Sequence, residues 1–337
     1  MRFANWLFGA LLLGGLAWTG WWFALARGQE AALDAWFADR ASAGWQAEHE
    51  RIGLTGFPLR LNRQITEIRL SDPRTGWAWT APWLAIESAA FQPIWWDVTF
   101  PNEQSVAVPG ERTAVTSDLM EAELELRPGP ALTLIHARAK TGRLNVKARS
   151  GWNAKAGSVV ADIAERVNDD GYEIDFTAEK LVLPQPLMRR IDPTGLAGRN
   201  LERMTFDGAA VFDAPLDRYL IEEGRLALRE LLVRSAGFQW GRMRMLAEGR
   251  IEVDARGYPE GALDLTMRHW RDIIEMARRS GMIGRDLAKG LITALEVVAM
   301  LSGDNKELDA TLTFADGKIW IGPVSVGDAP RLAPPRS

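Results

Sequence analysis

The sequence predicts a mainly β protein of the β-rich α+β class. An N-terminal transmembrane helix is followed by a large curved antiparallel sheet or sandwich, with a C-terminal helical insertion between hairpins. Three observations predict this architecture: a long uncharged run at the start, alternating apolar and polar residues through the middle, and one late region with apolar residues at helical spacing. At 337 residues the chain can bury a sizeable core, in one large domain or two ordinary ones.

Residues 1–26 are predicted to form an uncleaved transmembrane signal anchor. Phe3 to Ala26 is an uncharged run of 24 residues, which would span about 36 Å as a helix and exceed the ~30 Å hydrocarbon core of a bilayer. A cleavable signal peptide is the alternative, because residues 24–26 have the small-residue pattern of a cleavage site. The run is too long for a signal-peptide core of about 7–15 residues, so the anchor is favoured.

Tryptophan is unusually frequent, and part of this excess lies in the predicted anchor. The chain has 15 tryptophans against 12 phenylalanines and 3 tyrosines. Indole rings prefer the headgroup boundary of a bilayer. This preference assigns a membrane-interface position to Trp6, Trp18, Trp21 and Trp22.

Residues 27–44 are predicted to be an amphipathic stalk helix that ends near Gly44. Its apolar positions, among them Leu33, Trp36 and Phe37, recur at helical spacing. The stalk lacks the basic polar face that holds interfacial helices on a bilayer. Packing on the following domain is therefore favoured over a position on the membrane surface.

Residues 45–328 are predicted to form a β-rich extracytoplasmic domain. In residues 118–127 and 172–178 apolar side chains alternate with acidic ones, so each predicted strand has one wet face. Proline and glycine mark an internal break at 184–200, which an elaborate loop within one sheet explains equally well. The proline-containing tail, residues 329–337, is predicted to be disordered.

Local signals predict where this domain turns and bends. Residues 168–171 and 316–317 have the composition of hairpin turns with glycine at positive φ. The apolar phase slips around Gly241, which predicts a β-bulge. A helical insert is predicted at about 269–302, with a break at Gly281.

Composition and motifs exclude several kinds of chemistry. The chain has no cysteine, which excludes disulfide scaffolds and thiol catalysis, and its soft nitrogen ligands are His49, His136 and His269. Forty basic and 44 acidic residues give a net charge of −4, without the basic footprint of a nucleic-acid-binding protein. No P-loop, G-x-S-x-G elbow or paired-histidine zinc motif occurs. We therefore predict no enzymatic activity, catalytic residue, cofactor, metal site or nucleic-acid partner, although a triad assembled by folding stays open.

Five further tryptophans fall within twenty residues of each other and are the candidate binding residues. One interpretation is an ordinary core of large side chains. Our hypothesis is that part of the cluster lines an apolar groove or meets the bilayer, because indoles suit half-wet sites. The set is Trp77, Trp79, Trp83, Trp95 and Trp96, of which the first two share one strand face if the segment is extended.

The order of several short motifs along the chain resembles a known bacterial family. The motifs include Gly56-Phe57-Pro58-Leu59-Arg60-Leu61, Ala81-Pro82-Trp83-Leu84, Phe238-Gln239-Trp240-Gly241 and Phe314-Ala315-Asp316-Gly317. With the preceding helix they resemble, over nearly the whole chain, the proteobacterial family catalogued as domain of unknown function 2125. This resemblance implies a single-pass protein of the bacterial inner membrane with a periplasmic C-terminal domain, without established activity or catalytic residues. The repeated short strands also look like the AsmA-like envelope proteins, which implies a part in lipid homeostasis.

Two functions of different class agree with these features, and a third stays open. The first is non-enzymatic binding or transfer of a lipid or another amphiphile along a curved sheet, in envelope homeostasis. The second is an anchored scaffold that recruits other envelope proteins through a sheet edge or the helical insert. The third is an envelope hydrolase, which would need buried carboxylates or a triad in one cleft. The expected partners are therefore the inner membrane, a lipid or amphiphile, and other envelope proteins.

Overall fold

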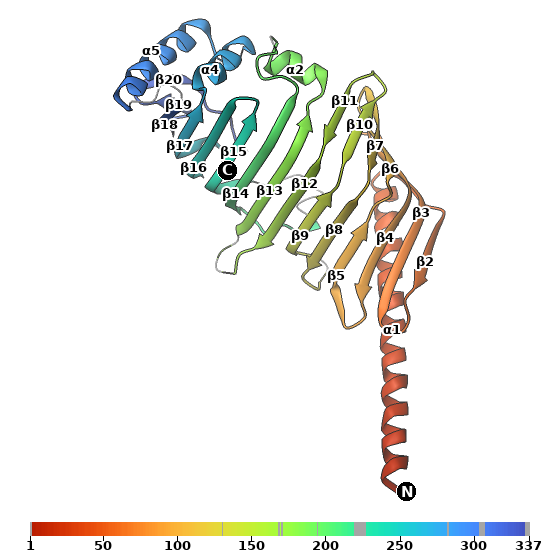
Figure 1. Cartoon of the computed structure of the whole chain (residues 1–337). Helices are drawn as coiled ribbons and strands as arrows, with labels where there is room; N and C mark the ends of the chain where they lie inside the picture. Colours follow the sequence, from red (N-terminus) through yellow and green to blue (C-terminus); the bar gives the residue numbers. More distant parts are fainter. Residues whose placement is uncertain are drawn as a thin grey trace. The chain divides into compact units, whose positions relative to one another are not determined.

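The structure of the protein is a computed structural model, whose described residues are 2–129, 131–167, 169, 171–193, 195–218, 227–281, 283–302 and 307–333. The chain forms two compact units, both drawn in Figure 1. Unit 1 comprises Met1–Glu125 with Ala148–Ser150, and unit 2 comprises Leu126–Lys147 with Gly151–Ser337. In each unit the strands pair antiparallel, which confirms the predicted mainly β fold.

Unit 1 consists of one long helix and eight antiparallel strands among its described residues. Strand β3 pairs with β1, β2 and β4; β4 pairs also with β5 and β6; β5 then pairs with β8, and β6 with β7. The elements are α1 (Arg2–Ser42), β1 (Gln46–Glu48), β2 (Arg51–Thr55), β3 (Arg60–Asp72), β4 (Trp77–Ala89), β5 (Gln92–Thr99), β6 (Glu103–Val108), β7 (Glu111–Ser117) and β8 (Met120–Leu126).

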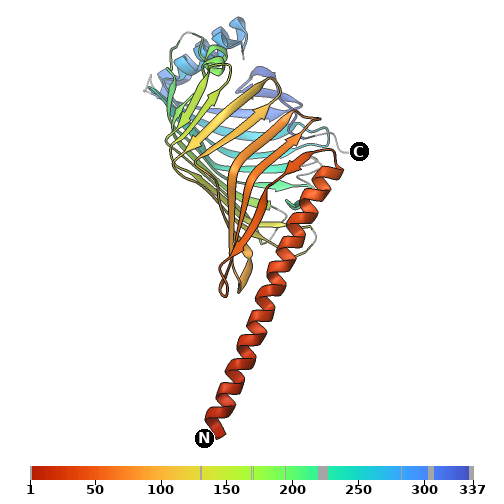
Figure 2. The ribbon, with the colours of Figure 1, turned by 90° about the vertical axis from the view of Figure 1, so that its right-hand side faces the viewer.

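Helix α1 confirms the predicted N-terminal helix and joins the predicted anchor and stalk into one element. It runs through Gly28 without a break and ends at Ser42, just before Gly44 at a φ of 86°. Its C-terminal half packs on β3, where Phe37 lies in one buried cluster with Ile65 and Ile68. Figure 2 shows this half beside the strands of unit 1 and the N-terminal half projecting beyond them.

The membrane-spanning part of the N-terminal prediction is not confirmed. No described helix, α1 included, combines the length and the mean hydropathy of a membrane span.

Unit 2 is a long antiparallel sheet in which neighbouring strands are mostly neighbours in sequence. Strand β9 pairs with β12, and β12 to β20 then pair in chain order, while the hairpin β10–β11 joins the sheet through β13. The strands are β9 (Leu134–Thr141), β10 (Leu144–Ala148), β11 (Asn153–Ala156), β12 (Ser158–Glu165), β13 (Gly171–Val182), β14 (Asn200–Phe212), β15 (Leu228–Trp240), β16 (Met243–Val253), β17 (Pro259–Arg268), β18 (Glu307–Ala315), β19 (Lys318–Ile321) and β20 (Val324–Asp328).

Three described helices lie at one end of the unit 2 strands (Figure 1). They are α2 (Gln185–Ile191), α4 (Trp270–Arg279) and α5 (Arg285–Ser302). The last two follow β17 and precede β18, which confirms the predicted helical insert between hairpins, and Gly281 between them has a φ of 77°. Strands β12 to β17 lie side by side in a single layer, so within this unit the sheet alternative holds and the sandwich does not.

The predicted turns have mixed outcomes. Asp316 and Gly317 both have positive φ and connect β18 to β19, as predicted. Gly171 is instead the first residue of β13 and has no positive φ, and residues 168 and 170 lie outside the described residues. The predicted bulge at Gly241 is wrong, because Trp240 pairs directly with Met243 and Gly241 sits at φ 56° in the two-residue turn between them.

The apolar phase slip around Gly241 therefore reflects a change of strand. The sheet does contain bulges, and one lies between Val233 and Ala236 of β15, where the pairing register shifts against β16. A turn and a bulge both move the apolar phase by one position, so the sequence pattern alone does not distinguish them.

Two further predictions concerned the break at 184–200 and the tail. Strands β13 and β14 on either side of 184–200 pair over most of their length, so this segment, which contains α2, is an elaborated loop within one sheet. In the tail, Ala329 and Ala333 are buried, and the Ala329 N–H donates to Gly317 O at 2.8 Å. Residues 334–337 lie outside the described residues.

Gly249 in β16 is a position where the sheet requires glycine. Its φ of 146° is in a region that L side chains rarely adopt, and an added Cβ would lie 2.2 Å from the carbonyl oxygen of Ala262 in β17. We expect Gly249→Ala to lower the free energy of unfolding by about 2–4 kcal/mol, measured by denaturant unfolding. The matched control is Gly53→Ala in β2, where the nearest atom would be 3.7 Å away and we expect a change within about 1 kcal/mol. Equal losses in both variants would contradict the assignment of strain to Gly249.

Candidate functional site

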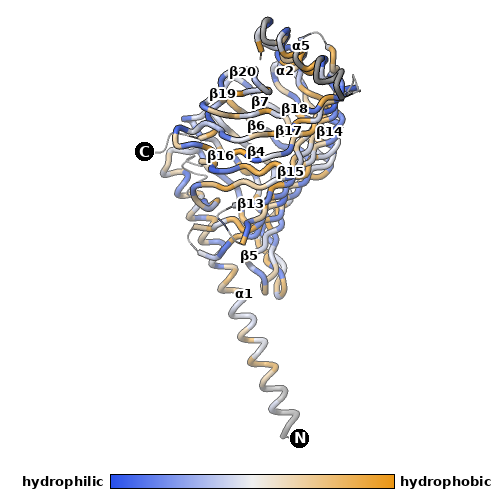
Figure 3. The backbone as a smooth tube through the Cα atoms, turned by 90° about the vertical axis from the view of Figure 1, so that its left-hand side faces the viewer, coloured by the Kyte–Doolittle hydropathy of each residue, from blue (hydrophilic) through white to orange (hydrophobic). Residues whose placement is uncertain are grey.

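One face of the unit 2 sheet is apolar from β12 to β18. The pairing register sets this face, because Ile174 of β13 stands opposite Ile163 of β12, and Phe176 opposite Phe206 of β14. Side chains alternate between the two faces of a strand, and Figure 3 shows the matching alternation of hydropathy along the strands. We call this set the apolar face: Val159, Ala161, Ile163, Ile174, Phe176, Ala178, Met204, Phe206, Ala210, Leu231, Val233, Ala236, Phe238, Met245, Ala247, Ile251, Leu263, Leu265, Met267, Leu308, Ala310, Leu312 and Phe314.

The opposite face of the same strands is polar and crossed by ion pairs. Arg203 of β14 lies 2.8 Å from Glu179 of β13, and Arg234 of β15 lies 2.6 Å from both Asp207 and Glu173. These cross-strand pairs are half-exposed, so each adds at most about 1 kcal/mol to stability. Their arrangement nevertheless identifies this face as the one turned to water.

Helices cover only one end of the apolar face within the described residues. Helix α4 contacts β16 and α5 contacts β18, and Trp270, Ile274 and Leu291 form one buried cluster with Met267 and Leu308. The β12–β14 part of the face belongs to none of the buried clusters, and Ile174, Phe176 and Phe206 are only half-buried. This part of the sheet therefore presents apolar side chains with no second layer of described structure packed on them.

The five tryptophans of the hypothesised groove lie on both faces of the unit 1 sheet. Trp77 and Trp79 share one strand face and join the cluster of β3 and α1. Trp83 stands opposite Thr66 and is not in that cluster, whereas its neighbour Leu84 is, so Trp83 points to the other face. Trp95 and Trp96 are consecutive and therefore point to opposite faces. Three of the indole N–H groups donate within the unit, Trp79 to Gln104 Oε1 at 2.6 Å, Trp95 to Asp97 Oδ1 at 3.3 Å and Trp96 to Pro93 O at 2.8 Å. The structure does not bring the five side chains together in one groove.

Three of the four predicted membrane-interface tryptophans connect α1 to loop residues and the first residue of β3 in unit 1. The Trp18 N–H donates to Pro58 O at 2.8 Å, the Trp22 N–H to Arg60 O at 2.8 Å, and the Trp21 N–H to Ala90 O at 3.1 Å. The fourth, Trp6, is 81% exposed. Trp22 is buried with Leu61 and Ala90 and has edge-to-face contacts with Phe23 and Phe57.

A buried arginine of β3 contacts α1 about one helical turn C-terminal of Trp22. Arg63 of β3 is 3% exposed, and its Nη2 donates to the backbone oxygen of Ala26. Burial lowers the pKa of Arg63 from its usual range, while the carboxylates of Glu30 and Asp34 on α1 act in the opposite direction. The charge on β3 therefore faces two acidic residues of the helix that covers it.

Among the described residues, the three histidines lie in separate places. The described residues contain no cluster of three or more His, Asp or Glu suited to a metal ion. His49 packs on Phe37, His136 Nε2 lies 3.2 Å from Asp162, and His269 precedes α4.

The two buried aspartates hold turns. Burial alone would raise the pKa of Asp72, but hydrogen bonds from the Arg74 N–H, the Thr75 hydroxyl and the Arg74 side chain hold that pKa below its usual value. Asp192 accepts the backbone N–H groups of Leu196 and Ala197 at 2.9 and 2.8 Å. Both carboxylates are thus engaged by neighbouring backbone.

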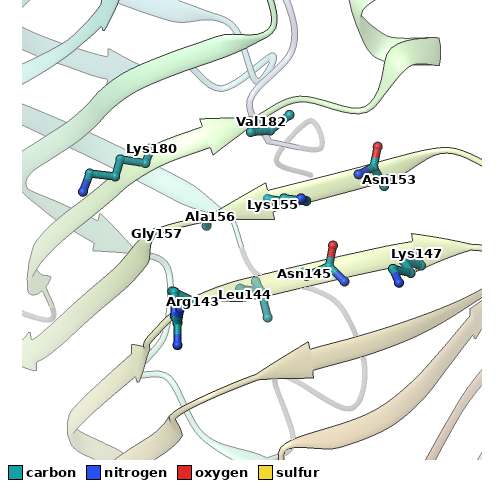
Figure 4. A pocket seen from close by; sticks show the side chains of 10 residues that line it. All are labelled: Arg143, Leu144, Asn145, Lys147, Asn153, Lys155, Ala156, Gly157, Lys180 and Val182. Atoms are coloured by element: carbon teal, nitrogen blue, oxygen red, sulfur yellow. The ribbon is translucent and has the colours of Figure 1, made fainter.

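A depression of about 440 Å³ lies over β10, β11 and β13 (Figure 4). Its rim carries Arg143, Lys147, Lys155 and Lys180, and no ion pair of the three lysines occurs among the described residues. Lys180 has a φ of 53° and lies next to Gly157, the residue between β11 and β12. The depression therefore concentrates positive charge without an acidic counterpart in its lining.

These features define a β-rich protein in which a long helix packs on the antiparallel strands of unit 1 and the antiparallel strands of unit 2 keep an apolar face. The chain belongs to the family described as uncharacterized protein conserved in bacteria (DUF2125), whose model matches residues 22–330. The match begins inside α1, at the buried Trp22. No curated protein and no solved structure matches the chain, so the expected AsmA-like resemblance is not shown.

The sequence reasoning missed the apolar face as a site and placed its candidates in the tryptophan cluster instead. A signal for the face was present in β13, where Ile174 and Phe176 alternate with acidic residues. Alternation shows that one side of a strand is apolar, but only the pairing register shows that the apolar sides of seven strands coincide.

Proposed function

We propose that this chain is a membrane-anchored, non-enzymatic protein of the bacterial cell envelope that binds or transfers a lipid or another amphiphile along the apolar face of unit 2. The observation that carries the proposal is the β12–β14 part of that face. It is a contiguous apolar surface, and the opposite face of the same strands carries cross-strand ion pairs. Contiguous apolar surfaces left without a covering layer are typical of ligand and interaction sites.

An acyl chain is the ligand that fits this surface chemically. The face offers methyl, methylene and aromatic groups from Ile163, Ile174, Phe176 and Phe206, and the backbone polar groups beneath them are already paired in the sheet. A hydrocarbon chain needs no hydrogen bond and gains about 0.8 kcal/mol per buried methylene. A ligand lying across several strands would therefore bind by its tail.

The proposed anchor is the N-terminal half of α1, inserted in the inner membrane with both units on the periplasmic side. Leu11, Leu12, Leu13 and Leu16 are all more than half exposed. Consecutive helical positions differ by about 100°, so these leucines face several directions around the helix. Apolar side chains on every side of a helix suit a surrounding of lipid better than one of water.

The test uses two neighbouring residues of β14 that point to opposite faces. We expect a photoreactive benzoylphenylalanine at Phe206 to crosslink to copurified lipid after gentle extraction, and the same residue at Thr205 to give no lipid adduct. In parallel, Phe206→Glu should remove most of the lipid that mass spectrometry detects, whereas Thr205→Glu should retain it.

Equal lipid content in both glutamate variants would contradict the proposal. A stoichiometric protein partner at Phe206, without lipid, would instead favour the scaffold function. Far-ultraviolet circular dichroism of both variants serves as the folding control.

A further inference from the structure

Two loops of unit 1 surround α1 at one level along the helix. Trp18 donates to Pro58 O in the loop between β2 and β3, and Trp22 donates to Arg60 O where β3 begins. Trp21 donates to Ala90 O in the loop between β4 and β5. The loops also contact each other, because the Ala90 N–H donates to Leu59 O at 2.9 Å. The level of Trp18 to Trp22 on the helix is therefore also the level of both loop tips.

The side chains at these loop tips are large, apolar and exposed. Phe57 is 52% exposed, Leu59 58% and Phe91 71%, although the backbone beside each is hydrogen-bonded. Trp21 and Phe23 of α1 are each 50% exposed at the same level. We call Phe57, Leu59, Phe91, Trp21 and Phe23 the apolar rim. Exposing so many large apolar groups to water in one place is costly unless another phase covers them.

The position of the rim on α1 indicates which phase this is. The exposed leucines at positions 11, 12, 13 and 16 lie on the N-terminal side of Trp18, so the rim is continuous with the apolar part of the helix. From Phe3 to Trp21 the helix extends about 28 Å, close to the ~30 Å hydrocarbon thickness of a bilayer. The rim therefore lies where the surface of a bilayer would meet a helix inserted to that depth, and aromatic side chains favour this boundary.

We propose that the apolar rim is a membrane-docking surface. Phe57, Leu59 and Phe91 insert into the interfacial region of the bilayer around α1 and hold unit 1 directly on the membrane. The proposal rests on the insertion of α1 proposed above. It adds a second contact with the same membrane, made by loops far from the helix in sequence.

The absence of native cysteine allows the test to use single-cysteine variants of the full chain. Leu59→Cys and Phe91→Cys report on the rim, and Leu12→Cys reports on the inserted helix. Val108→Cys is the matched control, because Val108 is also an exposed apolar side chain, 47% exposed. Val108 is the last residue of β6, next to the Ala78–Ala107 pair at the start of β4, whereas Phe91 follows the end of β4. Each variant is labelled with an environment-sensitive fluorophore and reconstituted in two sets of vesicles of phosphatidylethanolamine and phosphatidylglycerol. One set contains lipid spin-labelled near the headgroup, and the other contains lipid spin-labelled near the end of the acyl chain.

We expect headgroup-labelled lipid to quench the labels at 59 and 91, and acyl-chain-labelled lipid to quench the label at 12, several-fold more strongly than either lipid quenches the label at 108. Quenching at 12 with labels 59 and 91 behaving like 108 would overturn the rim and leave the anchor intact. Quenching at 59 and 91 without quenching at 12 would support the rim and overturn the inserted helix. No quenching at any of the four positions would overturn both.

Discussion

Replacing Trp270 by alanine should lower the free energy of unfolding by about 3–5 kcal/mol and release the helices α4 and α5 from the sheet. Trp270 is 0% exposed and lies in one cluster with Met267 and Leu308 of the sheet and with Leu291 and Leu295 of α5. Its removal takes the largest fully buried side chain from the cluster that joins both helices to β17 and β18.

A conservative replacement separates packing from polarity at this position. The indole nitrogen of Trp270 is buried and has no hydrogen-bond partner among the described residues. Trp270→Phe therefore removes an unpaired donor together with part of the packing, and we expect it to cost less than half as much as Trp270→Ala. Hydrogen exchange of α4 and α5 together with thermal unfolding measures both effects. Equal losses for the two variants would show that the aromatic packing is not what holds the helices.

Replacing Trp22 by alanine should have the second large effect, a loss of about 3 kcal/mol that is localised at the junction of α1 with unit 1. Trp22 is 4% exposed, donates to Arg60 O at 2.8 Å and contacts Phe23 and Phe57 edge to face. The variant loses both the buried ring and the hydrogen bond. We expect faster hydrogen exchange in the loop at 56–60 and in the helix around Ala26.

The matched control for Trp22 is Trp6→Ala, on the same helix. Trp6 is 81% exposed and has no described contact with the strands or loops of unit 1. Its removal should therefore leave hydrogen exchange in the loop at 56–60 unchanged in detergent. Trp22→Phe should lose about 1 kcal/mol, the typical value of one hydrogen bond. Similar exchange in the Trp6 and Trp22 variants would contradict the assignment of the junction to Trp22.

Periodic patterns predicted the elements of this fold better than their arrangement. The helical stripes on either side of Gly281 and the alternation in β8 and β13 identified real elements, because each depends on neighbours a few residues apart. The slip at Gly241 was misinterpreted because a tight turn and a bulge have the same local signature. The predicted anchor and stalk form one helix: Gly28 carries a helix-propensity cost of about 1 kcal/mol, which the packing on both sides of it outweighs.

The candidate site was harder to predict for a different physical reason. The tryptophan set was chosen by proximity in sequence, yet adjacent strand residues such as Trp95 and Trp96 point to opposite faces. The apolar face instead joins residues such as Ile163, Phe206 and Leu265, which are distant in sequence and meet only through strand pairing. The hydrogen bonds of Trp18, Trp21 and Trp22 to backbone carbonyls of unit 1 could not be predicted either, because a sequence does not show which carbonyls lie within reach of an indole N–H.

The unbroken course of α1 couples two of its contacts by helical phase. Trp22 meets the loops of unit 1 and Phe37 meets β3, and fifteen residues separate them, about four turns plus 60°. Both side chains therefore leave the helix on the same side, and inserting a single residue between them would turn one contact by about 100° away from its partner. Because α1 is one continuous helix, the contacts of Trp22 and Phe37 share a single angular register. The uninterrupted helix therefore sets the loops that contact Trp22 and the strand that contacts Phe37 at a fixed angle about its axis.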